Sequence, residues 1–234
     1  MLKRWFSPSF PAPNPAQPVT VMGDIHGCLA LLRRALDQAK GQIVCVGDYI
    51  DRGPDSAGVL ALLRARPDIV CLMGNHEQMM LDFLDAPETH GERWLKSGGV
   101  QTLASFGLAC DGTAVAMRDA LRLALGQEGE AWLRALPSIW RSGNVAVTHA
   151  GADPALPLEA QDGHVLRWGH PNFLRNRRRD GQWVVRGHVI VGEAQAKDGI
   201  ISIDTGAYAT GRLTLCFVDA DGARFHEVTD GAAG

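Results

Sequence analysis

The sequence predicts an α/β fold in which helices cover a parallel sheet. This prediction comes from a unit that recurs three times: a short apolar run, a glycine followed by polar residues, and a segment with leucines at helical spacing. The three apolar runs are residues 19–22, 43–46 and 69–73. Strands that alternate with helices in this way form parallel sheets with helices on their faces. With 234 residues, 46% of them hydrophobic, the chain can bury the core of such a domain.

The first 17 residues are rich in proline, and we expect them to form an extended arm. Prolines rather than an apolar run follow Lys3 and Arg4, so we expect no secretory signal. The remaining residues, 18–234, are predicted to form a single domain. Its first helix ends near Gly41, and Pro54–Ser56 begins the second helix. The apolar face of the first helix carries Leu29, Leu32, Leu36 and Ala39.

Residues 78–140 are predicted to be mostly helical, as an insertion within the domain. Gly98 and Gly99 mark a turn inside this insertion. Beyond it, two further apolar runs at 145–147 and 183–185 predict strands. The alternation at the end of the chain predicts antiparallel strands at 200–204 and 213–218.

The composition excludes several classes of function. A net charge of −3 and a pI near 6.2 argue against a nucleic-acid partner or a membrane-surface partner. No apolar stretch approaches the roughly 20 residues of a transmembrane span. The five cysteines are scattered and odd in number, so we expect a reducing, cytoplasmic location. The composition gives no prediction of the oligomeric state.

Side chains that can bind metal ions follow the ends of five predicted strands. They are Asp24, His26, Asp48, Asn75, His76, His149 and His188. Oxygen donors combined with imidazoles favour manganese, iron, zinc or nickel over calcium or magnesium, and we expect manganese. The set is large enough for two divalent ions, and the two oxygens of Asp48 can be shared between them. Two metal ions that lie about 3.5–4 Å apart and share a carboxylate ligand are typical of enzymes that hydrolyse phosphate esters.

Phosphate-ester hydrolysis needs three further groups. A cation binds the phosphate, an acid protonates the departing alkoxide, and a third group orients that acid. Arg52, His76 and Asp51 are the candidates for these roles. A structural ion pair between Asp51 and Arg52 is the simpler alternative, and helix capping is the simpler role for the aspartates near strand ends.

The motifs GDIHG (23–27), GDYIDRG (47–53) and GNHE (74–77), in this order and spacing, resemble those of the phosphoprotein phosphatase family. That family is the Ser/Thr protein phosphatase branch of the calcineurin-like metallophosphoesterases. Later signatures match at His149, at Gly187-His188 and, in the form of bacterial members, at 203–207. The resemblance implies a catalytic domain with two β-sheets sandwiched between helices (α/β/β/α) and residues 78–140 as a helical cap insertion.

The resemblance also implies a role for each site residue. One metal ion would be bound by Asp24, His26 and Asp48, and the second by Asp48, Asn75, His149 and His188. His76 would be the general acid, paired with Asp51. Arg52, together with Asn75, would bind the phosphate.

Two positions depart from the family pattern. Bacterial relatives carry a second phosphate-binding arginine in a Leu-Trp-x-Arg motif, and alignment on Phe173 places His170 in that slot. Arg167 is the candidate substitute, with His170 as a second candidate substrate contact. Arg186 stands where relatives commonly carry another histidine.

The sequence therefore predicts a two-metal phosphomonoesterase. Its substrate would be a phosphorylated protein or peptide carrying phosphoserine or phosphothreonine, with phosphotyrosine also allowed, and metal-bound hydroxide would attack phosphorus in line. The alternative is hydrolysis of a dinucleoside polyphosphate of the diadenosine tetraphosphate type at the same site. Relatives with that activity tend to read Gly-Asn-His-Asp and to lack the equivalent of Asp51. A non-enzymatic phosphate-binding module is a third hypothesis, which the intact ligand set disfavours.

Overall fold

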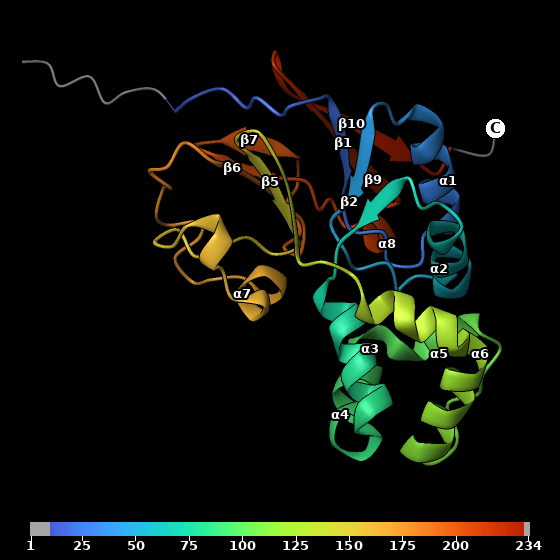
Figure 1. The fold of residues 1–234 in the computed structure, drawn as a ribbon. Coiled ribbons are helices and arrows are strands. Elements are labelled where there is room, and N and C mark those ends of the chain that lie inside the picture. The colour runs from blue at the N-terminus through green and yellow to red at the C-terminus, as the bar shows by residue number, and fades with distance from the viewer. Residues whose placement is uncertain (1–9, 232–234) are drawn as a thin grey trace, which may run out of the picture.

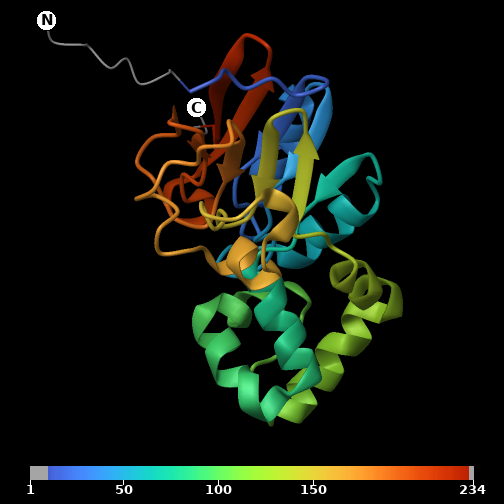
Figure 2. The same cartoon turned by 60° about the vertical axis from the view of Figure 1, so that its left-hand side comes forward.

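The computed structural model of the protein describes residues 10–231. Residues 1–9 of the predicted arm lie outside the described part, and residues 10–17 contain no helix or strand. Two five-stranded sheets stand face to face, with helices on their outer faces (Figures 1 and 2). The predicted α/β/β/α class is thus confirmed.

The first sheet contains the three strands of the recurring unit. These strands run parallel, with Val21 opposite Val44 and Val44 opposite Val70. The C-terminal hairpin adds two antiparallel strands beside the first strand. In spatial order the strands are β10 (Gly222–Thr229), β9 (Arg212–Asp219), β1 (Val19–Met22), β2 (Gln42–Cys45) and β3 (Ile69–Cys71).

The second sheet is mixed. In spatial order its strands are β4 (Ile139–Ser142), β5 (Val145–Thr148), β6 (Trp183–Arg186), β8 (Ile200–Ser202) and β7 (Gln195–Lys197). β5, β6 and β8 are parallel, whereas β4 and β7 are antiparallel edge strands. The strand predicted at 200–204 therefore pairs in a different sheet from the strand at 213–218, and it is antiparallel only to β7.

Apolar side chains of both sheets fill the space between them. Valines of β1, β2, β5 and β6 alternate inward with period two, so that Val21, Val44, Val147 and Val185 belong to one buried cluster. On the outer face of the first sheet lie α1 (Leu29–Gln38) and α2 (Ser56–Arg64), which bury their leucines against it. α7 (Gly163–Trp168) packs on the second sheet through Leu166. Figure 1 shows α1 and α2 on one side of the sandwich and α7 on the other.

The remaining helices follow β3 and gather beyond one end of the sandwich (Figures 1 and 2). They are α3 (Asn75–Asp85), α4 (Pro87–Trp94), a π-helical turn (Leu95–Gly99), α5 (Val100–Ser105) and α6 (Ala114–Arg134). A single turn, α8 (Ala207–Thr210), precedes β9. Among residues 10–231, no helix is both long enough and apolar enough to cross a membrane.

Candidate metal centre

The predicted ligands lie in four loops and at the start of α3, and each of these five segments follows the end of a strand in one of the two sheets. Five site residues in these loops have the left-handed backbone conformation, which is uncommon outside glycine. They are His26, Asp48, Asp51, Arg52 and His188, with φ between 44° and 70°. In the described part, only one other non-glycine residue, Asp198, has a positive φ. Strained backbone of this kind concentrates at functional sites, where the surrounding structure must hold it in place.

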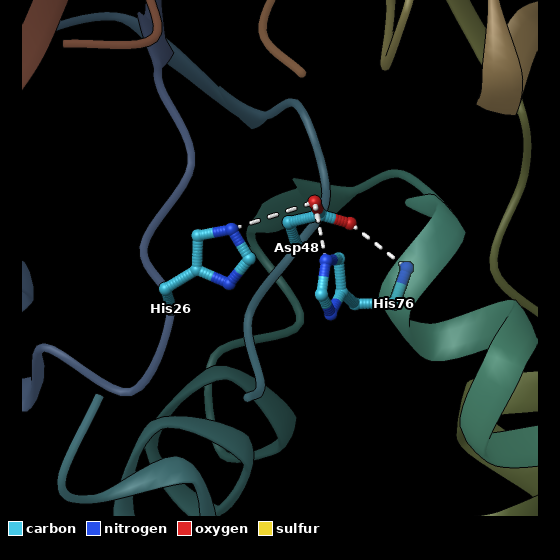
Figure 3. Close-up of side chains that lie close together, drawn as sticks. All are labelled: His26, Asp48 and His76. Carbon is cyan, nitrogen blue, oxygen red and sulfur yellow. Dashed lines mark hydrogen bonds and ion pairs between the residues drawn. The ribbon is translucent and has the colours of Figure 1, made fainter. Parts of the chain in front are cut away.

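Asp48 stands at the centre of two clusters of possible ligand atoms. In the first cluster, Nε2 of His26 lies 3.6 Å and Nε2 of His76 lies 3.9 Å from Oδ2 of Asp48 (Figure 3). The other oxygen of Asp48 accepts a hydrogen bond from the backbone N–H of His76 at 3.0 Å. All three side chains are at most 3% exposed. Asp48 thus presents one oxygen to each side of the site.

The second cluster lies on the Oδ1 side of Asp48. Nε2 of His149 is 3.4 Å from this oxygen and 2.8 Å from Oδ1 of Asn75. Nδ1 of His188 is 2.8 Å from the same Asn75 oxygen and 3.2 Å from Nε2 of His149. Ligands that bind one transition metal at about 2.0–2.2 Å also stand about 3 Å apart. The four predicted ligands of the second metal ion therefore converge.

The tautomers of two histidines test whether these atoms fit a cation. Nδ1 of His149 faces the carbonyl oxygen of Val46 at 3.2 Å, and Nδ1 of His26 faces that of Ile50 at 2.8 Å. A carbonyl oxygen only accepts, so Nδ1 carries the proton in both rings and Nε2 is a bare lone pair. The lone pair of His149 then points at oxygens of Asp48 and Asn75, which are acceptors too. Acceptors that converge without a proton between them fit a bound cation.

The charges of the site also fit a cation. Burial, and then the nearby carboxylate of Glu77, raise the pKa of Asp48 well above its ordinary range. Burial, and then Asp204, do the same to the pKa of Asp24. Burial and neighbouring imidazoles lower the pKa of His149 well below its usual value, so this ring is neutral and able to bind a metal. A divalent ion would pair with both carboxylates and thereby lower the pKa values of Asp48 and Asp24 again.

Asp24 stands beside the two clusters rather than inside either of them. Both of its carboxylate oxygens accept the backbone N–H of His188, at 3.0 and 3.2 Å. The chain after β6 comes so close that a Cβ at Gly187 would lie 1.8 Å from Oδ1 of Asp24. The grouping of Asp24 with His26 and Asp48 around one metal ion stays a prediction.

His76 of the first cluster also belongs to a buried hydrogen-bonded pair. Nδ1 of His76 and Oδ2 of Asp51 are 2.6 Å apart. Burial raises the pKa of Asp51 to about 8, and burial together with Arg52 lowers the pKa of His76 to about 3. With these pKa values the pair keeps one proton between Nδ1 and Oδ2 near neutral pH. The second proton of the pair is then on Nε2 of His76, on the side of Asp48.

Glu77 stabilises the backbone of the site. It is part of the GNHE motif, but the motif alone gave it no role. Its carboxylate accepts three backbone N–H groups, those of Asp48 at 2.9 Å, Tyr49 at 2.8 Å and Gly74 at 3.0 Å. Glu77 therefore joins the loop after β2 to the start of α3. Trp94, which the sequence motifs do not include, is buried and donates Nε1–H to Asp51.

Similarity to known proteins agrees with this geometry. Residues 17–192 match the sequence model of the calcineurin-like phosphoesterases. The chain belongs to this family. It is 32% identical to serine/threonine-protein phosphatase 1 of Salmonella typhimurium over 209 residues, 84% of this chain and 90% of that protein. The resemblance to phosphoprotein phosphatases is thereby confirmed, and the protein is a metal-dependent phosphoesterase.

Other relatives of this calcineurin-like phosphoesterase have a different named activity. A symmetrical bis(5'-nucleosyl)-tetraphosphatase of Methylococcus capsulatus is 30% identical over 151 residues, 60% of this chain and 45% of that protein. The crystal structure of a proposed diadenosine tetraphosphatase superposes with a TM-score of 0.65 at 25% identity, covering 94% of this chain and 97% of that one. The family is thus shown, whereas its members differ in substrate.

The candidate phosphate contacts of this calcineurin-like phosphoesterase divide into two groups. Arg52 is exposed beside the first cluster, 3.2 Å from Nε2 of His26, and its guanidinium lies over the ring of Tyr208. Arg167 instead donates to Ser138, and His170 pairs with Asp153 at 3.8 Å. Among the described contacts, none joins Arg167 or His170 to a predicted metal ligand.

Proposed function

We propose that this enzyme is a two-metal phosphomonoesterase that acts on phosphoserine and phosphothreonine in proteins or peptides. The supporting observation is the buried Asp51–His76 pair beside the ligand clusters. An alkoxide is a poor leaving group and needs a proton as it departs. A phosphate leaving group, released from a dinucleoside polyphosphate, is far less basic and needs little protonation. The presence of an oriented general acid therefore favours the phosphoester of an alcohol, rather than a dinucleoside polyphosphate, as the substrate.

We propose manganese as the ion at both positions, with the seven donors divided as the family resemblance implies. These donors come from Asp24, His26, Asp48, Asn75, His149 and His188, with Asp48 serving both ions. When bound, the two ions acidify a water molecule and neutralise charge on the phosphoryl oxygens. We also propose that the enzyme works in the cytoplasm, where its five free cysteines stay reduced.

The protein side chains then bind the phosphate and move one proton. Arg52, exposed and charged, reaches the phosphate from the His26 side. Its charge is one cause of the low pKa of His76, and the dianionic substrate offsets that charge. His76 donates the proton on Nε2 to the departing oxygen, and the Asp51 proton moves onto Nδ1. The pair recovers its proton from solvent after product release.

Substitution of His76 tests this assignment. We expect His76→Asn to lower kcat on a phosphoserine peptide by about 100- to 10,000-fold, the usual contribution of a general acid. The metal content should stay at two ions per chain, because His76 is the acid and not a ligand. His226→Asn, which changes an exposed histidine of β10, is the control and should leave both quantities unchanged. Loss of one ion in His76→Asn, or unchanged kcat, would contradict the assignment.

A symmetrical dinucleoside tetraphosphatase is the second candidate, because relatives with that name are up to 30% identical over long alignments and a structure described as a diadenosine tetraphosphatase superposes on this chain. The two functions are separated by one comparison under the same manganese concentration. If the enzyme is a protein phosphatase, its kcat/KM should be higher for a phosphopeptide than for diadenosine tetraphosphate. The opposite ranking would make the tetraphosphatase the better assignment.

A further inference from the structure

Two side chains of the helical insertion reach the carboxylate of Asp51. Nε1 of Trp94, at the end of α4, lies 3.1 and 3.2 Å from the two carboxylate oxygens. Oγ1 of Thr102 in α5 donates to Oδ1 at 2.7 Å and accepts the backbone N–H of the same aspartate at 2.9 Å. With His76 on Oδ2, the carboxylate is hydrogen-bonded on every side. These contacts fix its rotation and hence the direction in which Oδ2 points.

The backbone between these two side chains also binds the residue that follows the aspartate. The carbonyl of Gly98 in the π-helical turn accepts the N–H of Arg52 at 3.3 Å. A Cβ at Gly98, whose φ is 120°, would lie 2.6 Å from this nitrogen and 3.0 Å from Cβ of Asp51. Gly98 is not helical, and the chain bends at this glycine between α4 and α5. The turn is therefore packed directly on the Asp51-Arg52 dipeptide.

This dipeptide needs external support. Asp51 and Arg52 have φ values of 70° and 68°, two consecutive non-glycine residues in the left-handed region. Such a conformation persists only where neighbouring groups hold it. Ser56 and Thr102 accept the backbone N–H of Asp51, and the carbonyl of Gly98 accepts that of Arg52. Of these three acceptors, Gly98 and Thr102 belong to the helical insertion.

A purely apolar role does not account for Trp94. Its ring stacks on Phe83 with centroids 4.8 Å apart and is fully buried, which phenylalanine would satisfy equally well. Its indole N–H, however, is directed at a carboxylate that already binds His76. A buried indole N–H usually has a hydrogen-bond partner, and here the partner is the side chain that orients His76.

We propose that Trp94, Gly98 and Thr102 form a clamp that positions Asp51, and through it His76, for proton donation to the leaving group. This inference rests on the proposed function, because it acts through the acid assigned there. The three clamp residues are positioning residues that do not touch the substrate. The helical insertion thus helps to position the general acid, although these three residues are not predicted metal ligands.

The test compares two substrates with different leaving groups. A phosphoserine peptide releases an alkoxide, which needs the acid, whereas p-nitrophenyl phosphate releases a phenolate, which needs it much less. A misplacement of about 1 Å at a catalytic group can cost about 100-fold in rate. A loosened clamp should therefore lower kcat on the peptide by about tenfold to 100-fold. The kcat on p-nitrophenyl phosphate should change by less than about threefold, and KM and metal content should stay the same.

Thr102→Val and Thr102→Ser are the primary variants. Valine keeps the shape of threonine and removes the hydroxyl, whereas serine keeps the hydroxyl and should restore activity on the peptide. Trp94→Phe removes the N–H and keeps a stacked ring. Trp132→Phe is its control, because Trp132 lies in α6, packs near Tyr49 and makes none of the described hydrogen bonds to Asp51. The melting temperature of each variant shows whether it is folded. If Trp94→Phe does not fold, the two Thr102 variants still test the clamp.

The outcomes separate the clamp from the proposed function. If His76→Asn loses peptide activity selectively but Thr102→Val loses both substrates equally, or neither, the clamp is wrong and the acid stands. If His76→Asn itself lacks this selectivity, the acid and the clamp are both overturned. Selective loss in His76→Asn, Thr102→Val and Trp94→Phe, with rescue by Thr102→Ser, supports both.

Discussion

Gly187 offers a way to displace the carboxylate of Asp24 without changing its chemistry. A Cβ at this position would lie 1.8 Å from Oδ1 and 2.9 Å from Cγ of Asp24, and 2.8 Å from Cγ2 of Val46. Contacts of a Cβ shorter than 3.0 Å are essentially never seen. Gly187→Ala must therefore increase the separation of this Cβ from the carboxylate oxygen of Asp24 by at least about 1.2 Å, the difference between 3.0 and 1.8 Å, and we expect the side chain of Asp24 to move.

Such a movement is large for a metal site. Metal–ligand distances are held to within about 0.2 Å, so a shift of about 1.2 Å removes the Asp24 oxygen from the coordination sphere. Loss of an outer-shell partner alone costs about 10- to 100-fold in metal affinity, and we expect at least the upper end of this range here. Overpacking adds a loss of stability of about 1–3 kcal/mol.

Isothermal titration with manganese and metal analysis after dialysis measure the effect. We expect Gly187→Ala to keep one tightly bound ion and to bind the other, the ion assigned to Asp24, at least about 100-fold more weakly. Gly192→Ala is the matched control, since a Cβ there meets no atom within 4 Å. Two ions bound by Gly187→Ala with unchanged affinity would refute the assignment of Asp24 as a ligand.

Three further predictions concern metal removal, a buried carboxylate and a surface ion pair. Dialysis against EDTA should abolish activity, and manganese at 100 times its Kd should restore it and raise the unfolding free energy by about 2.7 kcal/mol, as differential scanning calorimetry measures. A stability that does not depend on manganese would contradict this. Glu77→Gln places an NH₂ group against buried N–H donors and should lower the unfolding free energy in urea by about 2–4 kcal/mol, whereas the exposed Glu88→Gln should not. Arg134 lowers the pKa of Asp85, so their pair stabilises the fold above the ordinary carboxyl pKa and this contribution is lost as pH falls through the lowered pKa. Asp85→Asn should therefore cost at most about 1 kcal/mol at pH 7, because the pair is exposed, and progressively less as the pH falls through the lowered pKa; a cost that does not change with pH would exclude the ion pair as the cause.

The parallel strands and the convergence of the ligands could be predicted because both are local in the sequence. Each strand is an apolar run that ends at a glycine, and the metal-binding side chain follows within three residues, as Asp48 follows Val46. Parallel strands place such residues at one edge of the sheet. His149 and His188 could be added in the same way from the second set of strands.

The remaining features depend on contacts that leave no periodic signal. β10 was not predicted, because Arg224 and His226 on this edge strand are exposed and only Val228 is buried. The pairing of β8 with β6 could not be read from its own residues. The hydrogen bond from Trp94 to Asp51 spans 43 positions, and a tryptophan in a helical segment has the same pattern whether or not its N–H binds a carboxylate.

Anomalous diffraction from manganese-soaked crystals tests the shared role of Asp48 most directly. We expect two peaks about 3.5–4 Å apart, one beside each carboxylate oxygen of Asp48, with His149 and His188 around the second. A single peak, or two peaks of which only one contacts Asp48, would contradict the two-metal centre.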